Sequence, residues 1–117
     1  AIRLDTQALS GGPTGVTRTM KQKQKHPPSK CIGIDVDGTL LIHGKLNKIL
    51  ADWIKDKHEE GFETVLWSAR GRSHALNVAR SFDIESYFDA IISKPGYIVD
   101  DLGWSWIKYT RVITEFK

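Results

Sequence analysis

The sequence predicts an α/β fold in which helices pack against a central parallel sheet. From residue 31 onward, short apolar runs alternate with segments whose apolar residues recur at helical spacing. Several of the apolar runs end in polar side chains of complementary chemistry. Open α/β sheets hold their ligands at the carboxyl ends of parallel strands, so these positions are the first candidates for a functional site.

The bulk composition is that of one small globular domain. The chain has 117 residues, of which 40% are hydrophobic and 26% are charged. It has no apolar stretch of the ~20 residues that a membrane helix needs and no apolar core of a signal peptide, so we expect a cytoplasmic protein without a membrane partner. Cys31 is the single cysteine, which excludes an internal disulfide and a cysteine-based zinc cage. We expect its thiol to be a small core group.

Residues 1–30 are expected to form a flexible basic tail ahead of a domain at 31–117. This segment carries six basic side chains and one acidic side chain, whereas the rest of the chain is mildly acidic. Glycine and proline in residues 10–15 and 26–29 disfavour regular structure. Two interpretations stay open: a solvated tail, or a segment that attracts nucleic acid.

Two strands and two helices are predicted in the first part of the domain. Residues 31–36 are an almost continuous apolar run, typical of a buried parallel strand. Residues 46–60 have helical periodicity and stop at Gly61. Residues 64–67 predict a second strand that ends at Ser68. Ser73 is the expected cap of a helix that reaches Phe82, with Leu76, Ala79 and Phe82 facing inward.

The later elements are less regular. Residues 90–92 predict a third strand and residues 97–99 a fourth, although a parallel pair normally needs a crossover of about a dozen residues. Residues 90–92 are therefore either a stub outside the sheet or a strand that leaves it early. Residues 112–116 are compatible with a fifth strand, and Trp106, Ile107 and Tyr109 with packing on the core.

Asp35 and Asp37 follow the first strand directly and are the strongest functional signal. Alternate residues of a strand point to the same side, so the two carboxylates can project together. Two carboxylates this close repel each other unless a cation or a shared proton lies between them. Gly38 permits a tight turn whose N–H groups can bind an anion. The alternative is a strand that ends in an ordinary polar turn.

Further polar residues follow the other predicted strands. Ser68 ends the second strand, Lys94 follows the third, and Asp100 and Asp101 end the fourth. Carboxylate oxygens without nitrogen or sulfur ligands favour Mg²⁺, and lysine and serine supply contacts to a phosphate. A carboxylate beside Mg²⁺ and a bound phosphate can attack phosphorus. The pattern therefore predicts phosphoryl chemistry.

The segment Asp-Val-Asp-Gly-Thr, followed in order by Ser68, Lys94 and Ile-Val-Asp-Asp, resembles the haloacid dehalogenase (HAD) superfamily. The resemblance covers residues 31 to about 103 and includes all four motifs of that family. It implies a three-layer, Rossmann-like sandwich and a hydrolase that acts on phosphomonoesters. The Asp at position 37 favours phosphatase chemistry over dehalogenation.

The resemblance also implies a role for each matching residue. Asp35 matches the nucleophile, and Asp37 matches the general acid and base, with its backbone carbonyl on the metal. Lys94 matches the lysine that balances the charge of the nucleophile and the phosphate. The residues expected around the phosphate are Gly38, Thr39, Ser68, Ala69 and Lys94, and those expected around Mg²⁺ are Asp35, Asp37, Asp100 and Asp101.

Two further groups of residues have no assigned role. Arg70 and Arg72 either reach the substrate phosphate or are solvated loop residues. The histidines at positions 43, 58 and 74 have no partner that the sequence identifies, and they are interpreted as structural or exposed.

The short spacing between the motifs predicts that the domain has no cap. Thr39 and Ser68 are separated by 28 residues, and Ser68 and Lys94 by 25, so neither gap can hold a further domain. Residues 40–44 are the expected flap. The chain resembles small capless hydrolases of bacteria and phages, whose open sites admit macromolecular phosphates or are closed by a neighbouring subunit. The alternative is a binding module on the same scaffold, docked through the basic tail.

Overall fold

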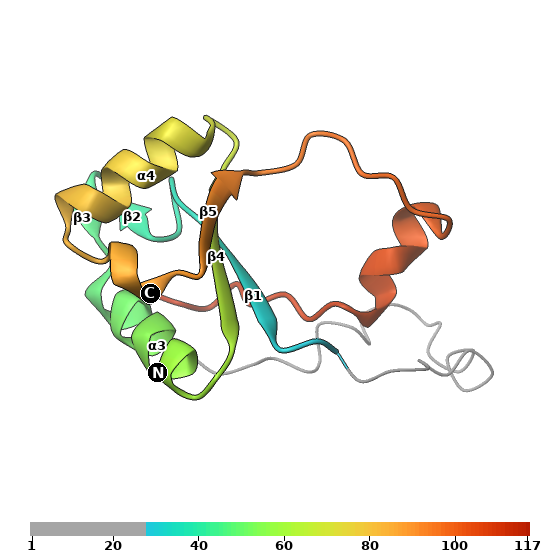
Figure 1. The fold of residues 1–117 in the computed structure, drawn as a ribbon, viewed down its shortest axis with the longest axis horizontal. Coiled ribbons are helices and arrows are strands. Elements are labelled where there is room, and N and C mark those ends of the chain that lie inside the picture. The colour runs from blue at the N-terminus through green and yellow to red at the C-terminus, as the bar shows by residue number, and fades with distance from the viewer. Residues whose placement is uncertain (1–27) are drawn as a thin grey trace. The chain divides into compact units, whose positions relative to one another are not determined.

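The computed structural model describes residues 28–117, which fall into two units (Figure 1). The first unit contains residues 30–97 and 116–117, and the second contains residues 28–29 and 98–115. The expected tail lies outside the described residues except for residues 28–30.

A three-stranded parallel sheet forms the centre of the first unit, as the sequence predicts (Figure 1). Its strands are β1 (Cys31–Asp35), β4 (Glu63–Ser68) and β5 (Ala90–Ser93), in the order β1-β4-β5. The register pairs Asp35 with Trp67 and Ser68 with Ser93. The last residues of all three strands therefore lie on one edge of the sheet.

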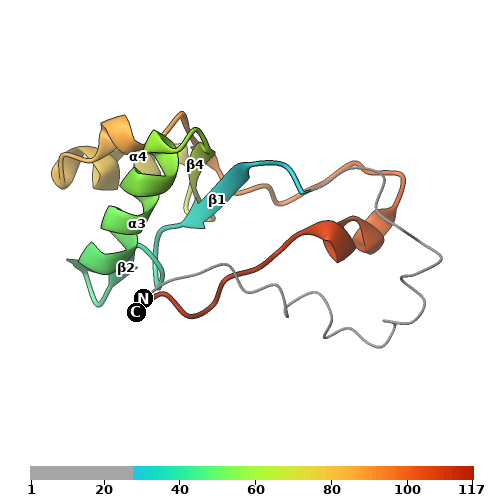
Figure 2. The same ribbon diagram turned by 90° about the horizontal axis from the view of Figure 1, so that it is seen from below.

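Two helices cover one face of this sheet. Helix α3 (Lys48–Glu59) joins β1 to β4, and α4 (Arg72–Ser81) joins β4 to β5. Both crossovers step across the sheet in the same direction, so the right-handed rule places both helices on the same face, as Figure 2 shows. The core contains buried residues from the sheet and from both helices: Ile34, Leu66, Leu50, Ile54, Val78 and Ala79. The described part of the first unit thus has a layer of sheet and a layer of helices.

Strand β1 differs from the sequence predictions in two ways. Strand β1 alternates between exposed and buried residues instead of being buried throughout. Cys31 is exposed, so the prediction that its thiol lies in the core is wrong. An apolar run does not distinguish a strand covered on both faces from one covered on a single face.

A short hairpin stands where the flap was predicted. It consists of β2 (Leu41–Ile42) and β3 (Lys45–Leu46), which pair antiparallel. The two turn residues, His43 and Gly44, have φ angles of 53° and 76°. Positive φ at both central residues is the geometry of a tight two-residue hairpin turn.

Helix α4 begins differently from the prediction. Gly71, with φ of 105°, precedes the helix, and no side chain of its own caps it, so Ser73 is not the cap. Instead, the hydroxyl of Ser93 on β5 accepts a hydrogen bond from the N–H of Arg72 at 3.0 Å. The inward face is also shifted: Ala75, Val78 and Ala79 are buried, whereas Phe82 is exposed.

The predictions for the end of the chain are only partly correct. Residues 90–92 belong to β5 inside the sheet, beyond a single turn of 3₁₀ helix, η1 (Glu85–Tyr87). Residues 97–99 are not a strand, so that prediction is wrong, and residues 112–116, whose sequence is compatible with a strand, do not form one. The second unit contains one 3₁₀ segment, η2 (Gly103–Tyr109), in its described part. Within residues 28–117, no helix is long and apolar enough to cross a membrane.

Candidate functional site

The loop after β1 is a tight, internally bonded turn at the carboxyl edge of the sheet. The N–H of Leu41 donates to the carbonyl of Val36 at 2.9 Å, and the N–H of Thr39 donates to the same carbonyl at 3.1 Å. Gly38 has φ of 85°, and its N–H donates to the carbonyl of Leu41 at 2.8 Å. The N–H groups of Gly38 and Thr39, which were expected to face an anion, therefore bond within the loop itself. These hydrogen bonds hold Asp35 and Asp37 in place.

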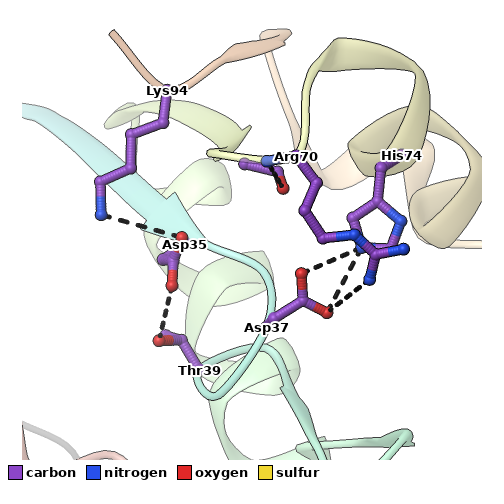
Figure 3. A network of polar contacts seen from close by, with 7 residues as sticks. Asp35, Asp37, Thr39, Arg70, His74 and Lys94 are labelled. Atoms are coloured by element: carbon purple, nitrogen blue, oxygen red, sulfur yellow. Dashed lines mark hydrogen bonds and ion pairs between the residues drawn. The ribbon is translucent and has the colours of Figure 1, made fainter. Parts of the chain in front are cut away.

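Asp35 lies between a hydroxyl and an ammonium group (Figure 3). The hydroxyl of Thr39 donates to its Oδ2 at 3.4 Å, and Nζ of Lys94 lies 3.8 Å from its Oδ1. The backbone N–H of Lys94 donates to the carbonyl of Ser68 at 2.9 Å, which fixes the residue after β5 to the end of β4. Three of the predicted site residues, from the ends of β1 and β5, are thus brought together.

Asp37 contacts the side chains of His74 and Arg70 (Figure 3). Nε2 of His74, on the first turn of α4, lies 3.1 Å from Oδ2 and 3.3 Å from Oδ1. Nη1 of Arg70 lies 3.6 Å from Oδ1. Arg70 therefore contacts Asp37 in this structure, and a contact of Arg70 with a substrate phosphate stays a prediction.

His74 is the site residue that the sequence reasoning missed, because no motif marks it. The signal is indirect: a helix that follows a parallel strand begins at the carboxyl edge of the sheet, so its first turn lies near the loops of neighbouring strands. His74 stands three residues after Gly71, where α4 begins. A polar side chain at that position is placed to reach the loop after β1.

Ser68 and Ala69 form the turn at the end of β4. The side chain of Ser68 is 1% exposed, and its Oγ accepts a hydrogen bond from the N–H of Arg70 at 3.0 Å. Its carbonyl accepts a hydrogen bond from the N–H of Gly71 at 3.0 Å. Ser68 therefore caps the strand and shapes the loop that carries Arg70, while Ala69 is exposed on it.

Asp100 and Asp101 belong to the second unit and are both exposed. Oδ1 of Asp100 accepts a hydrogen bond from the N–H of Leu102 at 2.8 Å, and its carbonyl accepts one from the N–H of Gly103 at 3.2 Å. The two carboxylates thus stand in the turn that leads into η2.

The carboxylates of Asp35 and Asp37 lie at the surface of the first unit. Asp35 and Asp37 have side chains that are 34% and 47% exposed. A groove of about 340 Å³ is lined by residues of the hairpin, of α3 and of the C-terminus, none of which is a predicted site residue: Ile42, Leu46, Asn47, Lys48, Ile49 and Lys117.

Oxygen donors at this edge suit a hard cation such as Mg²⁺. Asp35 and Asp37 supply two carboxylates from one loop. Among residues 28–117, no three histidine, cysteine, aspartate or glutamate side chains are grouped as a metal site. The donor type fits Mg²⁺, and the ligand set is part of the proposal below.

Comparison with known proteins finds one relative of interest. The chain is 34% identical over 71 residues to an uncharacterized 38.0 kDa protein in the P143-LEF5 intergenic region of Autographa californica nuclear polyhedrosis virus. The match covers 57% of this chain but 22% of the viral protein, so the chain spans about a fifth of that relative. No family profile matches the chain, and no solved structure matches it significantly.

Proposed function

We propose that the chain is a Mg²⁺-dependent phosphomonoester hydrolase of the HAD type, which works through an aspartyl-phosphate at an open, capless site. The proposal includes the three-layer, Rossmann-like sandwich of that family. One observation carries it: two carboxylates of a single loop stand at the carboxyl edge of a parallel sheet, and each contacts a side chain from another element. Asp35 has Lys94 at 3.8 Å, and Asp37 has His74 at 3.1 Å.

In the first step, a carboxylate oxygen of Asp35 attacks phosphorus while the bond from phosphorus to the leaving oxygen breaks. Asp37, protonated at the start, gives its proton to that oxygen, so an alcohol departs. The ammonium group of Lys94 offsets the charge that Asp35 and the phosphoryl group bring together.

In the second step, water attacks the phosphorus of the aspartyl-phosphate. Asp37 accepts a proton from that water, and the bond between phosphorus and the oxygen of Asp35 breaks. Inorganic phosphate leaves, and both carboxyl groups return to their initial states. Asp37 therefore alternates between acid and base, whereas Asp35 stays a nucleophile and leaving group.

In the proposed site, Asp35, the backbone carbonyl of Asp37 and Asp100 would hold Mg²⁺, with Asp101 as an auxiliary ligand. When bound, it would neutralise phosphoryl charge. Ser68, Ala69, Gly38 and Thr39 are the proposed surroundings of the phosphate. The exposed position of the carboxylates supports an open site that admits a macromolecular phosphate.

The test is phosphate release from 4-nitrophenyl phosphate with and without Mg²⁺. We expect metal-dependent turnover by the unmodified chain and a loss of at least about 1,000-fold in Asp35→Asn, which removes the nucleophile. Asp56→Asn, at an exposed position of α3, is the matched control and is expected to keep full activity. Absence of turnover on a broad panel of phosphomonoesters with Mg²⁺ would overturn the proposal.

A further inference from the structure

His74 makes a contact that ties α4 to the loop after β1. Its Nε2 lies within hydrogen-bonding distance of both carboxylate oxygens of Asp37, at 3.1 Å and 3.3 Å. The two residues are 37 positions apart in the sequence, so the contact depends on the tertiary fold. Figure 3 shows the imidazole reaching the carboxylate from the helix.

Arg70, the other partner of Asp37, is a weaker candidate for holding its carboxylate. Arg70 lies 3.6 Å from Oδ1, and its side chain is 66% exposed, whereas that of His74 is 21% exposed. Exposed ion pairs on long side chains contribute little, because solvent screens them and holding the side chain costs entropy. The short imidazole on a helix is therefore the better support for the carboxylate.

The two carboxylates of the loop, Asp35 and Asp37, contact different side chains. Asp35 contacts Lys94 and Thr39, and Asp37 contacts His74 and Arg70 (Figure 3). Residues of identical chemistry are thus oriented by separate groups from different elements. Two carboxylates with different tasks need such a division, because a nucleophile must face phosphorus and an acid must face the leaving oxygen.

We propose that His74 is a positioning residue that holds the carboxyl group of Asp37 in the orientation for proton transfer to the leaving oxygen. This inference rests on the proposed function. His74 does not contact the substrate, and it neither donates nor accepts a proton in the reaction. Its effect acts through Asp37 alone.

The proposal is tested by the dependence of rate on the leaving group. An alkyl alcohol leaves poorly without a proton, whereas 4-nitrophenolate leaves readily, so a misplaced acid slows the alkyl ester far more. In His74→Ala we expect kcat/KM to fall about 100-fold on an alkyl phosphate and less than about 5-fold on 4-nitrophenyl phosphate. The ratio of the two values is independent of the folded fraction of the variant.

Two further variants sharpen the test. His74→Gln keeps an amide donor near the same place and is expected to restore the ratio to within about 5-fold of the unmodified chain. Asn77→Ala, at an exposed position of the same helix, is the matched control and should leave the ratio unchanged.

The outcomes separate this proposal from the function on which it rests. An equal loss on both substrates in His74→Ala, or no loss on either, would overturn the positioning role while leaving the phosphatase in place. A chain that hydrolyses neither substrate with Mg²⁺ would overturn the proposed function and, with it, the role of His74.

Discussion

Lys94 offers the most direct test of charge balance at the level of single residues. Its ammonium lies 3.8 Å from Oδ1 of Asp35, and both side chains are partly exposed. In Lys94→Met, the negative charges of the nucleophile and the phosphoryl group lose their counterion. We expect kcat on 4-nitrophenyl phosphate to fall about 100-fold or more, as for other preorganised charge partners.

Lys94→Arg is the companion variant, since it keeps the charge but changes its shape. It should retain more activity than Lys94→Met in the same assay. Equal activity of Lys94→Met and the unmodified chain would show that this ammonium has no part in the reaction.

The site residues that the sequence predicts are those whose position follows from strand ends. Asp35 and Lys94 meet because β1 and β5 both end at the same edge of the sheet, and strand ends can be predicted from apolar runs. The contact between His74 and Asp37 could not be predicted in this way. It depends on the rotation of α4 about its axis, which its packing against the sheet determines.

Asn47 links three segments at the start of α3. Its Oδ1 accepts a hydrogen bond from the N–H of Leu50 at 3.2 Å, which caps the helix. Its Nδ2 donates to the carbonyl of Phe116 at 2.8 Å and to that of Thr39 at 3.4 Å. The residue thus supports both the helix and the loop that carries the two carboxylates.

We expect Asn47→Ala to lower the free energy of unfolding by about 1–2 kcal/mol, because the cap is lost. Asn47→Asp keeps the acceptor of the cap but loses the donor to Phe116 and Thr39. It should therefore be destabilised less than Asn47→Ala in denaturant titrations. Identical losses in the two variants would show that the loss of the Nδ2 donor to Phe116 and Thr39 costs as much as the loss of the cap.

Asp89 connects β4 to the segment before β5 through a polar network. Its Oδ2 accepts hydrogen bonds from the N–H of Thr64 at 2.8 Å and from the Thr64 hydroxyl at 3.3 Å, and Nδ1 of His58 lies 3.4 Å away. The hydrogen bond from the N–H of Thr64, followed by the charge of His58, lowers the pKa of Asp89 below its ordinary value. This network gives His58 the partner that the sequence did not identify.

The lowered pKa makes part of the stability depend on pH. The unfolded chain binds a proton at this group more readily than the folded chain does. The stabilisation is therefore fully present above the ordinary pKa of aspartate, about 3.9, and is lost as pH falls through the folded value. In Asp89→Asn, the midpoint of urea unfolding should fall less between pH 7 and pH 3 than in the unmodified chain. Equal acid sensitivity would contradict this assignment.

At the level of elements, the sequence predicts those helix ends that depend on residues nearby in the chain. The helix that the spacing before Gly61 predicts appears in the structure, because helix ends depend on neighbouring residues. The prediction for Ser73 failed because the partner of the first helical N–H comes from Ser93, on a distant strand.

At the level of the whole molecule, the prediction of a strand at residues 97–99 failed. These residues are apolar, yet the side chains of Tyr97 and Val99 are fully or almost fully exposed. Strand propensity alone does not form a strand, because pairing also needs a partner edge and a connection long enough to reach it. Only residues 94–96 lie between β5 and this segment, which is too short for a parallel crossover beside β5.

The distribution of charge along the chain predicts how it would discriminate between substrates. Residues 1–27 carry five basic side chains and one acidic side chain, and the remainder is close to neutral. If this segment binds the backbone of a nucleic acid, the affinity for a single strand falls with rising salt. Contacts from all five basic side chains would give a slope of about −3 to −4 in a plot of log K against log salt concentration. A free nucleotide offers no such backbone.

We therefore expect kcat/KM on a 3′-phosphorylated oligonucleotide to fall steeply between 50 and 200 mM salt, while that on a 3′-nucleotide changes by less than about 2-fold. Removal of residues 1–27 should abolish the difference but leave hydrolysis of 4-nitrophenyl phosphate unchanged. A full chain with glutamine at Lys21, Lys23 and Lys25 is the matched control for loss of charge without loss of length. Equal rates on oligonucleotide and nucleotide at every salt concentration would rule out nucleic acid as the partner of this segment, because a basic segment that bound the backbone would necessarily impose a dependence on salt.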